Sequence, residues 1–240
     1  MSVIPALVPA SELTIILMAK APIPGRVKTR LAASVGNEAA AAIHAAMTAC
    51  VLRRIKSSFD HSAQVGVPPS IRFSVAWDSP ALLDNFANPL KGWHVVPQGD
   101  GSLGDRMQRV WSDLGGKAVV FLGCDAPDVP TALMRAAVEG LATNPVMLGR
   151  AADGGYWTLA ARECHGGLLT GIDWGGPTVY DQTRVAAAAL NLSVGDAGLW
   201  RDVDTPADLA ALRQRLASAS DPALVELARA LAAICKDSPS

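Results

Sequence analysis

The pattern of apolar and polar positions along the chain predicts an α/β protein. Uninterrupted apolar runs are typical of strands buried on both faces of a sheet, and alternating stretches indicate half-buried strands. Strands are expected at 13–19, 71–77, 93–96, 118–123, 146–148 and 156–159. Longer amphipathic stretches predict helices at 38–56, 102–114, 131–141, 178–190 and 223–234, with a further helix after 205.

The order of these elements predicts the architecture. Strands alternate with helices through the first half of the chain, which favours a mostly parallel sheet covered by helices on both faces. We therefore expect a three-layer α/β/α fold with a mostly parallel mixed sheet. The sequence shows no internal repeat or low-complexity linker, so 1–240 is interpreted as one domain with loose ends at 1–12 and 236–240.

Composition narrows the functional classes. The chain has 240 residues, 50% of them hydrophobic, which is enough for a sizeable core. A formal net charge of -1 argues against a general nucleic-acid binder. Four scattered cysteines match neither a zinc motif nor a disulfide framework, and no signal peptide or membrane-spanning run is visible. We expect a soluble cytoplasmic protein, and the alanine-rich helices are compatible with a monomer or a homodimer.

A basic segment follows the first expected strand. Residues 18–31 contain two prolines and Gly25, which interrupt regular structure and predict a fixed, exposed loop. The segment carries four cations, Lys20, Arg26, Lys28 and Arg30. A rigid loop with four cations favours phosphate binding over a merely solvated turn. It lacks the spacing of a Walker A loop and the glycines of a dinucleotide fingerprint.

A second glycine-rich loop opens a helix. Ser102 and Asp105 have the spacing of a capping box. Arg106 in the first turn is unfavourable for the helix dipole, which indicates a different role. We include Arg106 among the candidate phosphate ligands.

Two aspartates are candidate metal ligands. Asp125 directly follows the most hydrophobic strand, where a carboxylate is costly unless it is paired or binds a cation. Asp204 precedes Thr205 and Pro206 and is either a ligand or a helix cap. Ligands bind at the carboxyl ends of strands in open α/β sheets, so the pair predicts Mg²⁺ or Mn²⁺ bridging protein and diphosphate.

A glycine turn carries the remaining candidates. Asp153 precedes two glycines and is interpreted as a catalytic base or acceptor contact, or as an ordinary Asp-Gly turn. Tyr156, Trp157 and Trp174 are candidates for an acceptor or sugar pocket, because aromatic faces stack on apolar sugar faces; the alternative is that they are core residues.

These segments together resemble the DUF2064 family, of the rSAM/selenodomain-associated transferase 1 type. The matching segments are 19–31, 101–107, 123–127, 153–157, 171–174 and 202–206. The resemblance implies a GT-A-like nucleotide-diphospho-sugar transferase fold, with Asp125 as the metal-binding aspartate and Asp204 as a second metal carboxylate. One segment departs from the family pattern Ser-Asp-Cys-Pro, since residues 124–127 read Cys-Asp-Ala-Pro here.

Two reactions fit these residues. The leading hypothesis is glycosyl transfer from a nucleotide sugar to a small acceptor, for which the metal and the cations stabilise the departing diphosphate. The alternative is nucleotidyl transfer, in which the basic loop binds a nucleoside triphosphate and pyrophosphate is released. A third alternative of another class is a non-catalytic nucleotide-binding protein. Neither a nucleic acid nor a membrane is expected as a partner.

Overall fold

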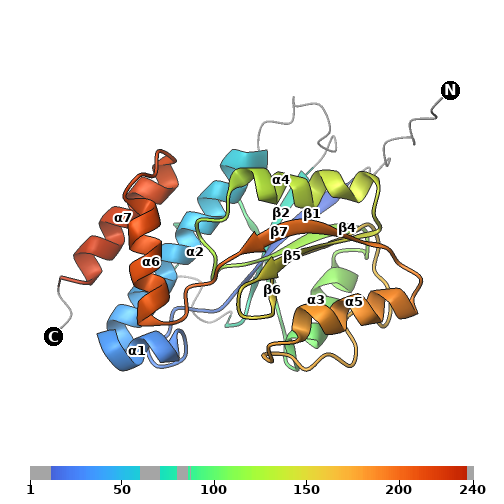
Figure 1. The fold of residues 1–240 in the computed structure, drawn as a ribbon, viewed down its shortest axis with the longest axis horizontal. Helices are drawn as coiled ribbons and strands as arrows, with labels where there is room; N and C mark the ends of the chain where they lie inside the picture. The colour runs from blue at the N-terminus through green and yellow to red at the C-terminus, as the bar shows by residue number, and fades with distance from the viewer. Residues whose placement is uncertain (1–11, 60–70, 80–85, 87, 237–240) are drawn as a thin grey trace.

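The computed structural model describes residues 12–59, 71–79, 86 and 88–236 (Figure 1). The ends that the sequence predicts to be loose, 1–12 and 236–240, lie outside the described residues except for Glu12 and Lys236. In the described part of the chain, no helix is long and apolar enough to cross a membrane.

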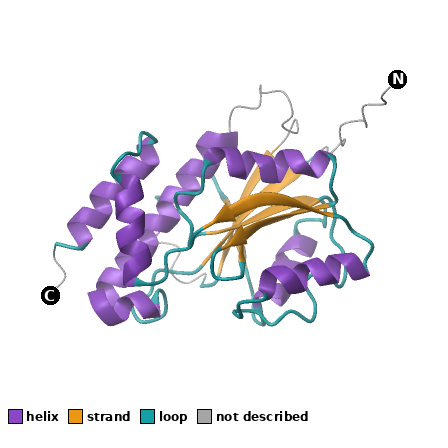
Figure 2. Ribbon diagram, in the orientation of Figure 1, coloured by secondary structure: helices purple, strands orange, loops and turns teal. Residues whose placement is uncertain are grey.

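A single mixed sheet forms the centre of the described structure (Figure 2). Its strand order is β3-β2-β1-β4-β6-β5-β7. The strands are β1 Leu13–Ala19, β2 Ile71–Trp77, β3 His94–Pro97, β4 Ala118–Gly123, β5 Val146–Ala151, β6 Tyr156–Ala161 and β7 Val194–Trp200. Among the described strands, β6 alone runs antiparallel to its neighbours β4 and β5, and the other pairs are parallel. The expected mostly parallel mixed sheet is confirmed.

Helices cover both faces of the sheet. In Figure 1, α2 and α4 lie on one side of the sheet and α3 and α5 on the other. The helices are α1 Thr29–Val35, α2 Asn37–Phe59, α3 Leu103–Asp113, α4 Thr131–Glu139, α5 Val179–Ala189, α6 Pro206–Leu216 and α7 Pro222–Ile234. A short 3₁₀ helix, Gly140–Ala142, follows α4. The α1, α6 and α7 helices pack beyond α2 and enclose a third apolar cluster with it.

The position of β1 explains its predominantly apolar sequence, in which Thr14 is the one polar residue. Successive side chains of a strand point to opposite faces of the sheet. Leu13, Ile15 and Leu17 belong to the apolar cluster under α2 and α4, and Ile16 belongs to the cluster under α3. All four side chains are at most 1% exposed. A strand buried on both faces therefore lacks the regular alternation of apolar and polar residues that a half-buried strand shows.

Two elements differ from the sequence interpretation. The basic segment is not a loop throughout, because α1 begins at Thr29. Strand β7 was not expected at all: Gly195, Asp196 and Gly198 have low strand propensity, and β7 is the edge of the sheet, where one neighbour is enough. Its pairing with β5, which is remote in sequence, holds it in place.

The topology brings several loops to one edge of the sheet. The segments that follow β1, β4, β5 and β7 all leave from the carboxyl ends of these parallel strands. Because β6 is antiparallel, the turn between β5 and β6 lies at the same edge. This is where open α/β sheets bind their ligands.

Candidate active site

Four carboxylates line one cavity at this edge. Asp125 follows β4, Asp153 lies in the turn after β5, and Asp202 and Asp204 follow β7. The cavity has a volume of about 290 Å³, and all four aspartates are among its lining residues. So many acidic groups around one cavity favour a cationic ligand or shared protons.

Lys28 joins two of these carboxylates. Its Nζ donates to Asp125 Oδ1 at 2.5 Å and to Asp204 Oδ1 at 2.8 Å. The Lys28 side chain is 3% exposed, whereas the carboxylates of Asp125 and Asp204 are 50% and 41% exposed. The ammonium therefore lies behind the two carboxylates, whose other oxygens face the solvent side.

The local backbone directs Lys28 to this place. Lys28 is the residue before α1 and has a left-handed conformation, with φ 47° and ψ 45°. Gly25 in the preceding turn also has a positive φ, 77°, which glycine adopts without strain. Val27 and Leu31 on either side are 3% and 0% exposed. These two apolar anchors fix the segment and turn the lysine inward.

The electrostatics of the group follow from this contact. Burial opposes the charged form of Lys28, but the carboxylates of Asp125 and Asp204 outweigh it and raise the pKa of the ammonium above its usual value. Burial likewise acts against an ionised Asp125, and the Lys28 charge overcomes it and lowers the pKa of that carboxyl. Both partners are therefore charged near neutral pH.

Asp204 does not cap the helix that follows it. Thr205 is the N-cap of α6: its side chain accepts from the backbone N–H of Asp208, whose carboxylate accepts from the N–H of Thr205. The cap interpretation of Asp204 is therefore wrong, and its side chain is available to the cavity. The backbone N–H of Val203 donates to the carbonyl of Asp125 at 2.9 Å, which holds the two acidic segments side by side.

Asp153 forms the Asp-Gly turn that the sequence suggested, and its side chain also lines the cavity. Its Oδ1 accepts from the N–H of Gly155 at 2.8 Å, as in an Asp-Gly turn, and the residue also lines the cavity. Gly154 has φ 96°, and a Cβ at this position would collide with the carbonyl oxygen of Pro177. The turn therefore packs closely against the segment that precedes α5.

Asp202 is the site residue that the sequence analysis missed. Burial, and after it the neighbouring Asp153 carboxylate with which it shares a hydrogen bond, raises the pKa of Asp202 to about 8. Two carboxyl groups in this position share a proton. The Asp-Val-Asp spacing was the only available signal, since residues two apart on an extended segment point the same way.

The predicted aromatic residues lie on the cavity wall. Tyr156, Trp157 and Trp174 all line it. The Tyr156 and Trp174 rings make an edge-to-face contact with centroids 6.2 Å apart. Trp157 is 4% exposed and donates its Nε1 to the carbonyl of Gly198 at 3.1 Å, so it also serves as a core residue. Trp157 therefore lines the cavity and packs in the core at the same time.

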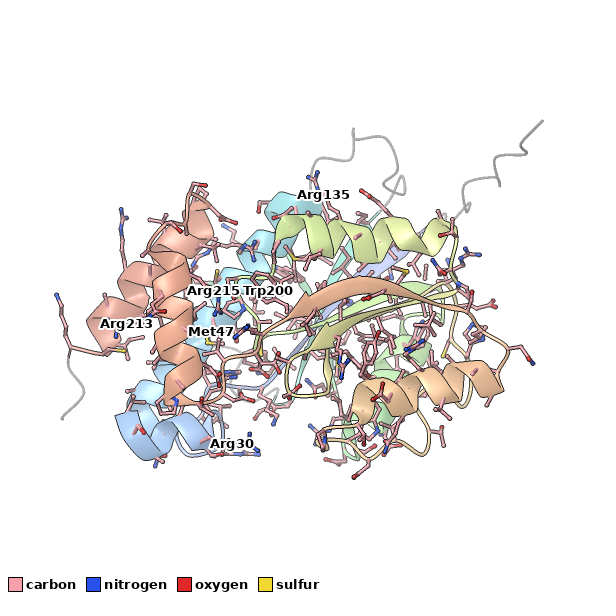
Figure 3. All side chains as sticks on the ribbon, viewed as in Figure 1. Arg30, Met47, Arg135, Trp200, Arg213 and Arg215 are labelled. Carbon is pink, nitrogen blue, oxygen red and sulfur yellow. The ribbon has the colours of Figure 1, made fainter. Side chains whose placement is uncertain are left out.

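The remaining cations of the basic segment lie outside the cavity wall. Lys20, Arg26 and Arg30 are exposed and do not belong to the described residues that line the cavity. The side chain of Arg30 extends outward from α1 (Figure 3). Lys20 directly follows β1, and its charge contributes to lowering the pKa of Asp125. None of the three side chains has an ion-pair partner among the described residues.

Arg106 contacts the second loop rather than the cavity. Its Nε donates to the carbonyl of Gly101 at 3.0 Å and its Nη1 to the side chain of Gln98 at 3.4 Å. Gln98, 4% exposed, in turn donates to the carbonyls of Ala19 and Ala76 at the ends of β1 and β2. Arg106 thus stabilises the loop 98–101. The predicted capping box of Ser102 and Asp105 is confirmed.

Two buried ion pairs hold the loop that carries Asp125. Arg54 of α2 donates to the carbonyl of Pro127 and to Asp221, both at 2.8 Å. Asp128 accepts from Arg215 of α6 and from Nε1 of Trp200. Arg215 and Trp200 lie next to each other in Figure 3. The C-terminal helices therefore fix the position of the Asp125 loop.

Comparison with known proteins adds to this geometry. The model of the DUF2064 family, described as an uncharacterized protein conserved in bacteria, matches residues 62–176. The resemblance to the DUF2064 family is confirmed. The DUF2064 match contains Asp125 and Asp153, whereas the basic segment and Asp204 lie outside it. No curated protein matches the chain significantly.

Solved structures share the fold of this chain. A "putative nucleotide-diphospho-sugar transferase" from Desulfovibrio desulfuricans is 26% identical with a TM-score of 0.75, over 93% of this chain and 96% of that one. Glucosyl-3-phosphoglycerate synthase from Mycobacterium tuberculosis, in complex with Mn²⁺ and UDP, is 12% identical with a TM-score of 0.52, over 97% and 84%. CMP:2-keto-3-deoxy-manno-octonic acid synthetase complexed with CTP is 13% identical with a TM-score of 0.52, over 86% and 98%. The GT-A-like fold is confirmed.

Proposed function

We propose that this protein is a metal-dependent transferase that binds a nucleotide-diphospho-sugar and transfers the glycosyl group to a small acceptor. The observation that carries the proposal is the meeting of Asp125 and Asp204 on one ammonium at the wall of an acidic, aromatic-lined cavity. The similarity to the Desulfovibrio desulfuricans protein, at 26% identity over nearly the whole of both chains, supports the same class of reaction.

The two carboxylates fit a divalent cation such as Mg²⁺ or Mn²⁺. One oxygen of each binds Lys28, and in the described part of the chain the other oxygen of each has no hydrogen-bond partner. Both groups are about half exposed toward solvent. Hard divalent ions prefer such carboxylate oxygens together with phosphate oxygens. The bound ion would offset the negative charge of the diphosphate.

The chain's own side chains divide the remaining tasks. Lys28 holds Asp125 and Asp204 in their relative orientation, because it donates to both. Lys20, Arg26 and Arg30 bind the phosphates, because their charges are exposed and have no ion-pair partner within the described part of the chain. Gly25 allows their turn, and Arg106 supports the neighbouring loop. Asp153 accepts the proton of the acceptor hydroxyl, while the neighbouring Asp202, whose pKa is raised by burial and by the Asp153 carboxylate, stays protonated near neutral pH.

The aromatic wall suits a sugar or acceptor. Tyr156 and Trp174 stand perpendicular to each other at the cavity and offer an apolar face and edge. Sugars stack their C–H faces on such rings while their hydroxyl groups reach nearby carboxylates. A cavity of about 290 Å³ has room for one small ring rather than for a polymer.

Nucleotidyl transfer is the second candidate. It is favoured by the three exposed cations after β1, Lys20, Arg26 and Arg30, which suit a triphosphate, and by the fold likeness to a synthetase complexed with CTP. In this reaction a phosphorylated small molecule would occupy the aromatic side of the cavity, and pyrophosphate would leave. A non-catalytic nucleotide-binding protein would have no use for the carboxylate pair.

Thermal denaturation separates these candidates. Nucleotide sugars and nucleoside triphosphates are added with and without Mn²⁺, since a ligand that binds the native state raises the melting temperature. We expect the largest Mn²⁺-dependent rise with a nucleotide sugar, and its loss in Asp125→Asn. A larger rise with a triphosphate would instead establish nucleotidyl transfer. If neither ligand raises the melting temperature in a Mn²⁺-dependent manner, both proposed reactions are contradicted.

A further inference from the structure

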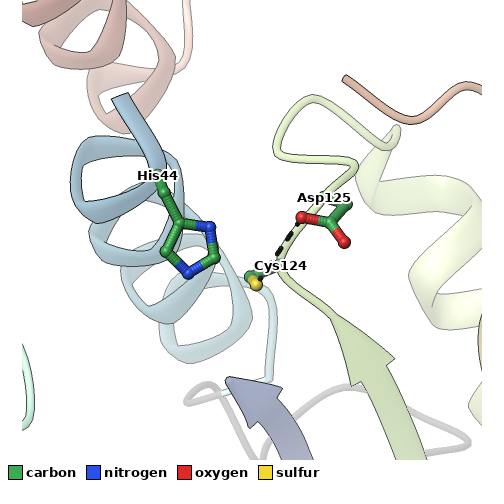
Figure 4. A group of neighbouring side chains, drawn as sticks. All are labelled: His44, Cys124 and Asp125. Carbon is green, nitrogen blue, oxygen red and sulfur yellow. Dashed lines mark hydrogen bonds between the residues drawn. The ribbon is translucent and has the colours of Figure 1, made fainter. Parts of the chain in front are cut away.

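Three potential metal ligands of different chemistry meet beside the carboxylate pair. His44 comes from α2, and Cys124 and Asp125 follow β4. One ligand atom of each residue lies within 4.8 Å of the other two. In Figure 4, Cys124 lies between the imidazole of His44 and the carboxylate of Asp125.

The hydrogen bonding of His44 leaves one nitrogen free. Nε2 lies 3.0 Å from the carbonyl oxygen of Lys20. A carbonyl only accepts, so Nε2 carries the hydrogen and Nδ1 carries a lone pair. Nδ1 is buried and has no hydrogen-bond partner among the described residues, in a side chain that is 3% exposed. Burial lowers the pKa of His44, so the ring is neutral.

An orphaned imidazole lone pair of this kind is costly unless a ligand uses it. Metal-binding histidines usually donate their second N–H to a backbone carbonyl or a carboxylate, which fixes the tautomer and turns the free nitrogen toward the ion. His44 already has this outer contact with Lys20. The ring is therefore prepared for a ligand that accepts its electrons.

We propose that His44, Cys124 and Asp125 bind a thiophilic divalent cation of the Zn²⁺ type. Thiolate and imidazole ligands select such an ion over Mg²⁺. Three protein ligands with nitrogen, sulfur and oxygen donors leave a fourth position open, as in exchangeable zinc sites. To surround the ion, the ligand atoms of the three residues must approach one another by about 1 Å from their present separations.

The charges of the complex balance. The Cys124 thiol releases its proton to solvent as the sulfur–metal bond forms, and the neutral imidazole gives its lone pair without proton exchange. The dication is then neutralised by one thiolate and one carboxylate, while Lys28 remains paired with Asp204. No buried charge is left without a partner.

The ion reaches this site through Asp125. Cys124 and His44 are 5% and 3% exposed, but the Asp125 carboxylate is half exposed at the cavity wall. An ion held by His44 and Cys124 takes over the carboxylate that the proposed Mg²⁺ or Mn²⁺ also needs. A soft cation would therefore compete with the hard one for Asp125. Binding itself does not depend on the proposed transferase activity.

The test uses Co²⁺ as a spectroscopic substitute for Zn²⁺ in the full chain, without nucleotide. We expect one Co²⁺ per chain and a thiolate-to-cobalt charge-transfer band in the near ultraviolet, which Zn²⁺ then abolishes by displacement. Cys124→Ser should remove the band, and His44→Gln should weaken Co²⁺ binding at least about tenfold. Cys164→Ser, a change at a partly exposed cysteine outside the group, should leave the band unchanged.

Circular dichroism shows whether each variant is folded. X-ray absorption of the wild-type cobalt complex needs no variant, so the test does not depend on the folding of the variants. One sulfur and one imidazole in the metal's first coordination sphere would support the site. Absence of the band in the wild type, its persistence in Cys124→Ser, or a coordination sphere of oxygen alone would overturn it. None of these results depends on nucleotide binding, so they are distinct from a failure of the proposed function.

Discussion

The Lys28 ammonium lies 2.8 Å from the Asp204 carboxylate, although 176 positions separate the two residues in the sequence. The same nitrogen binds Asp125 at 2.5 Å. Lys28 thereby connects the segment after β1 with the segments after β4 and β7. Its side chain is buried while both carboxylates are half exposed, so it supports the acidic wall of the cavity from behind.

Replacement of Lys28 by Met should destabilise the protein by about 1–3 kcal/mol, because two neighbouring carboxylates lose their shared cation. Urea denaturation at pH 7 measures the change. Lys20→Met is the control, since Lys20 belongs to the same segment but is exposed and forms no ion pair with any described residue. An equal loss in both variants would contradict the special role of Lys28.

The loss in Lys28→Met should depend on pH. The Lys28 charge lowers the pKa of Asp125 in the folded state below the ordinary 3.8. The resulting stabilisation is present above that ordinary value and disappears as the pH falls through the lowered pKa. Wild type and variant should therefore approach equal stability in acid, whereas a constant difference down to the acid transition would argue against an ionic cause.

Alanine at Arg26 or Arg30 should weaken nucleotide binding about tenfold each, because each removes one charge-assisted phosphate contact. The free energy of unfolding should stay within about 0.5 kcal/mol of wild type, since both side chains are exposed. Isothermal titration calorimetry gives the affinities. Arg213→Ala, an exposed arginine on α6 (Figure 3), should have no effect on binding. Unchanged affinity in both variants would show that Arg26 and Arg30 of the basic segment do not bind the phosphates.

Gly154→Ala should destabilise the protein by more than about 2 kcal/mol and impair ligand binding, because the added Cβ collides with the Pro177 carbonyl and displaces Asp153. The matched control is Gly175→Ala. Gly175 has a similar φ, 91° against 96°, but a Cβ there meets no atom of the described residues within 4 Å. Gly175→Ala introduces the backbone strain without the collision. Similar losses of stability in the two variants would therefore show that backbone strain alone is responsible.

Asp202→Asn should make the stability of the protein less dependent on pH. The pKa of Asp202 is raised from 3.8 to about 8, so the folded state holds a proton that the unfolded state releases in this range. Stability therefore falls as the pH rises from about 4 to about 8, and the cost persists above that.

Asparagine mimics the protonated carboxyl and removes this cost. The variant should be more stable than wild type by about 2 kcal/mol at pH 9 and equally stable near pH 4. The expected gain is smaller than the full pKa shift of Asp202 implies, because Asp153 shares the proton. Urea denaturation across this range is the measurement. Asp113→Asn, at an exposed aspartate of α3, should show no such trend. A variant that is less stable than wild type at pH 9 would refute the shared proton.

The sequence predicted much of the framework because its determinants are local. Strands β1, β2 and β4 have the expected bounds, since a strand buried on both faces or alternating in polarity is visible in the residues themselves. The capping box at Ser102 and Asp105 likewise depends on residues three apart. By contrast, β7 depends on its pairing with β5, and its own glycines gave no signal.

For the site, the residue types were predictable and their arrangement was not. The sequence by itself identified Asp125, Asp153 and Asp204 by their positions at strand ends and turns, where parallel topology brings side chains together. Only the tertiary structure decided that Lys28 faces the acids rather than the solvent, and that Asp202 belongs to the cavity. The physical reason is that charge pairing and burial depend on distances between segments remote in sequence, which no local pattern encodes.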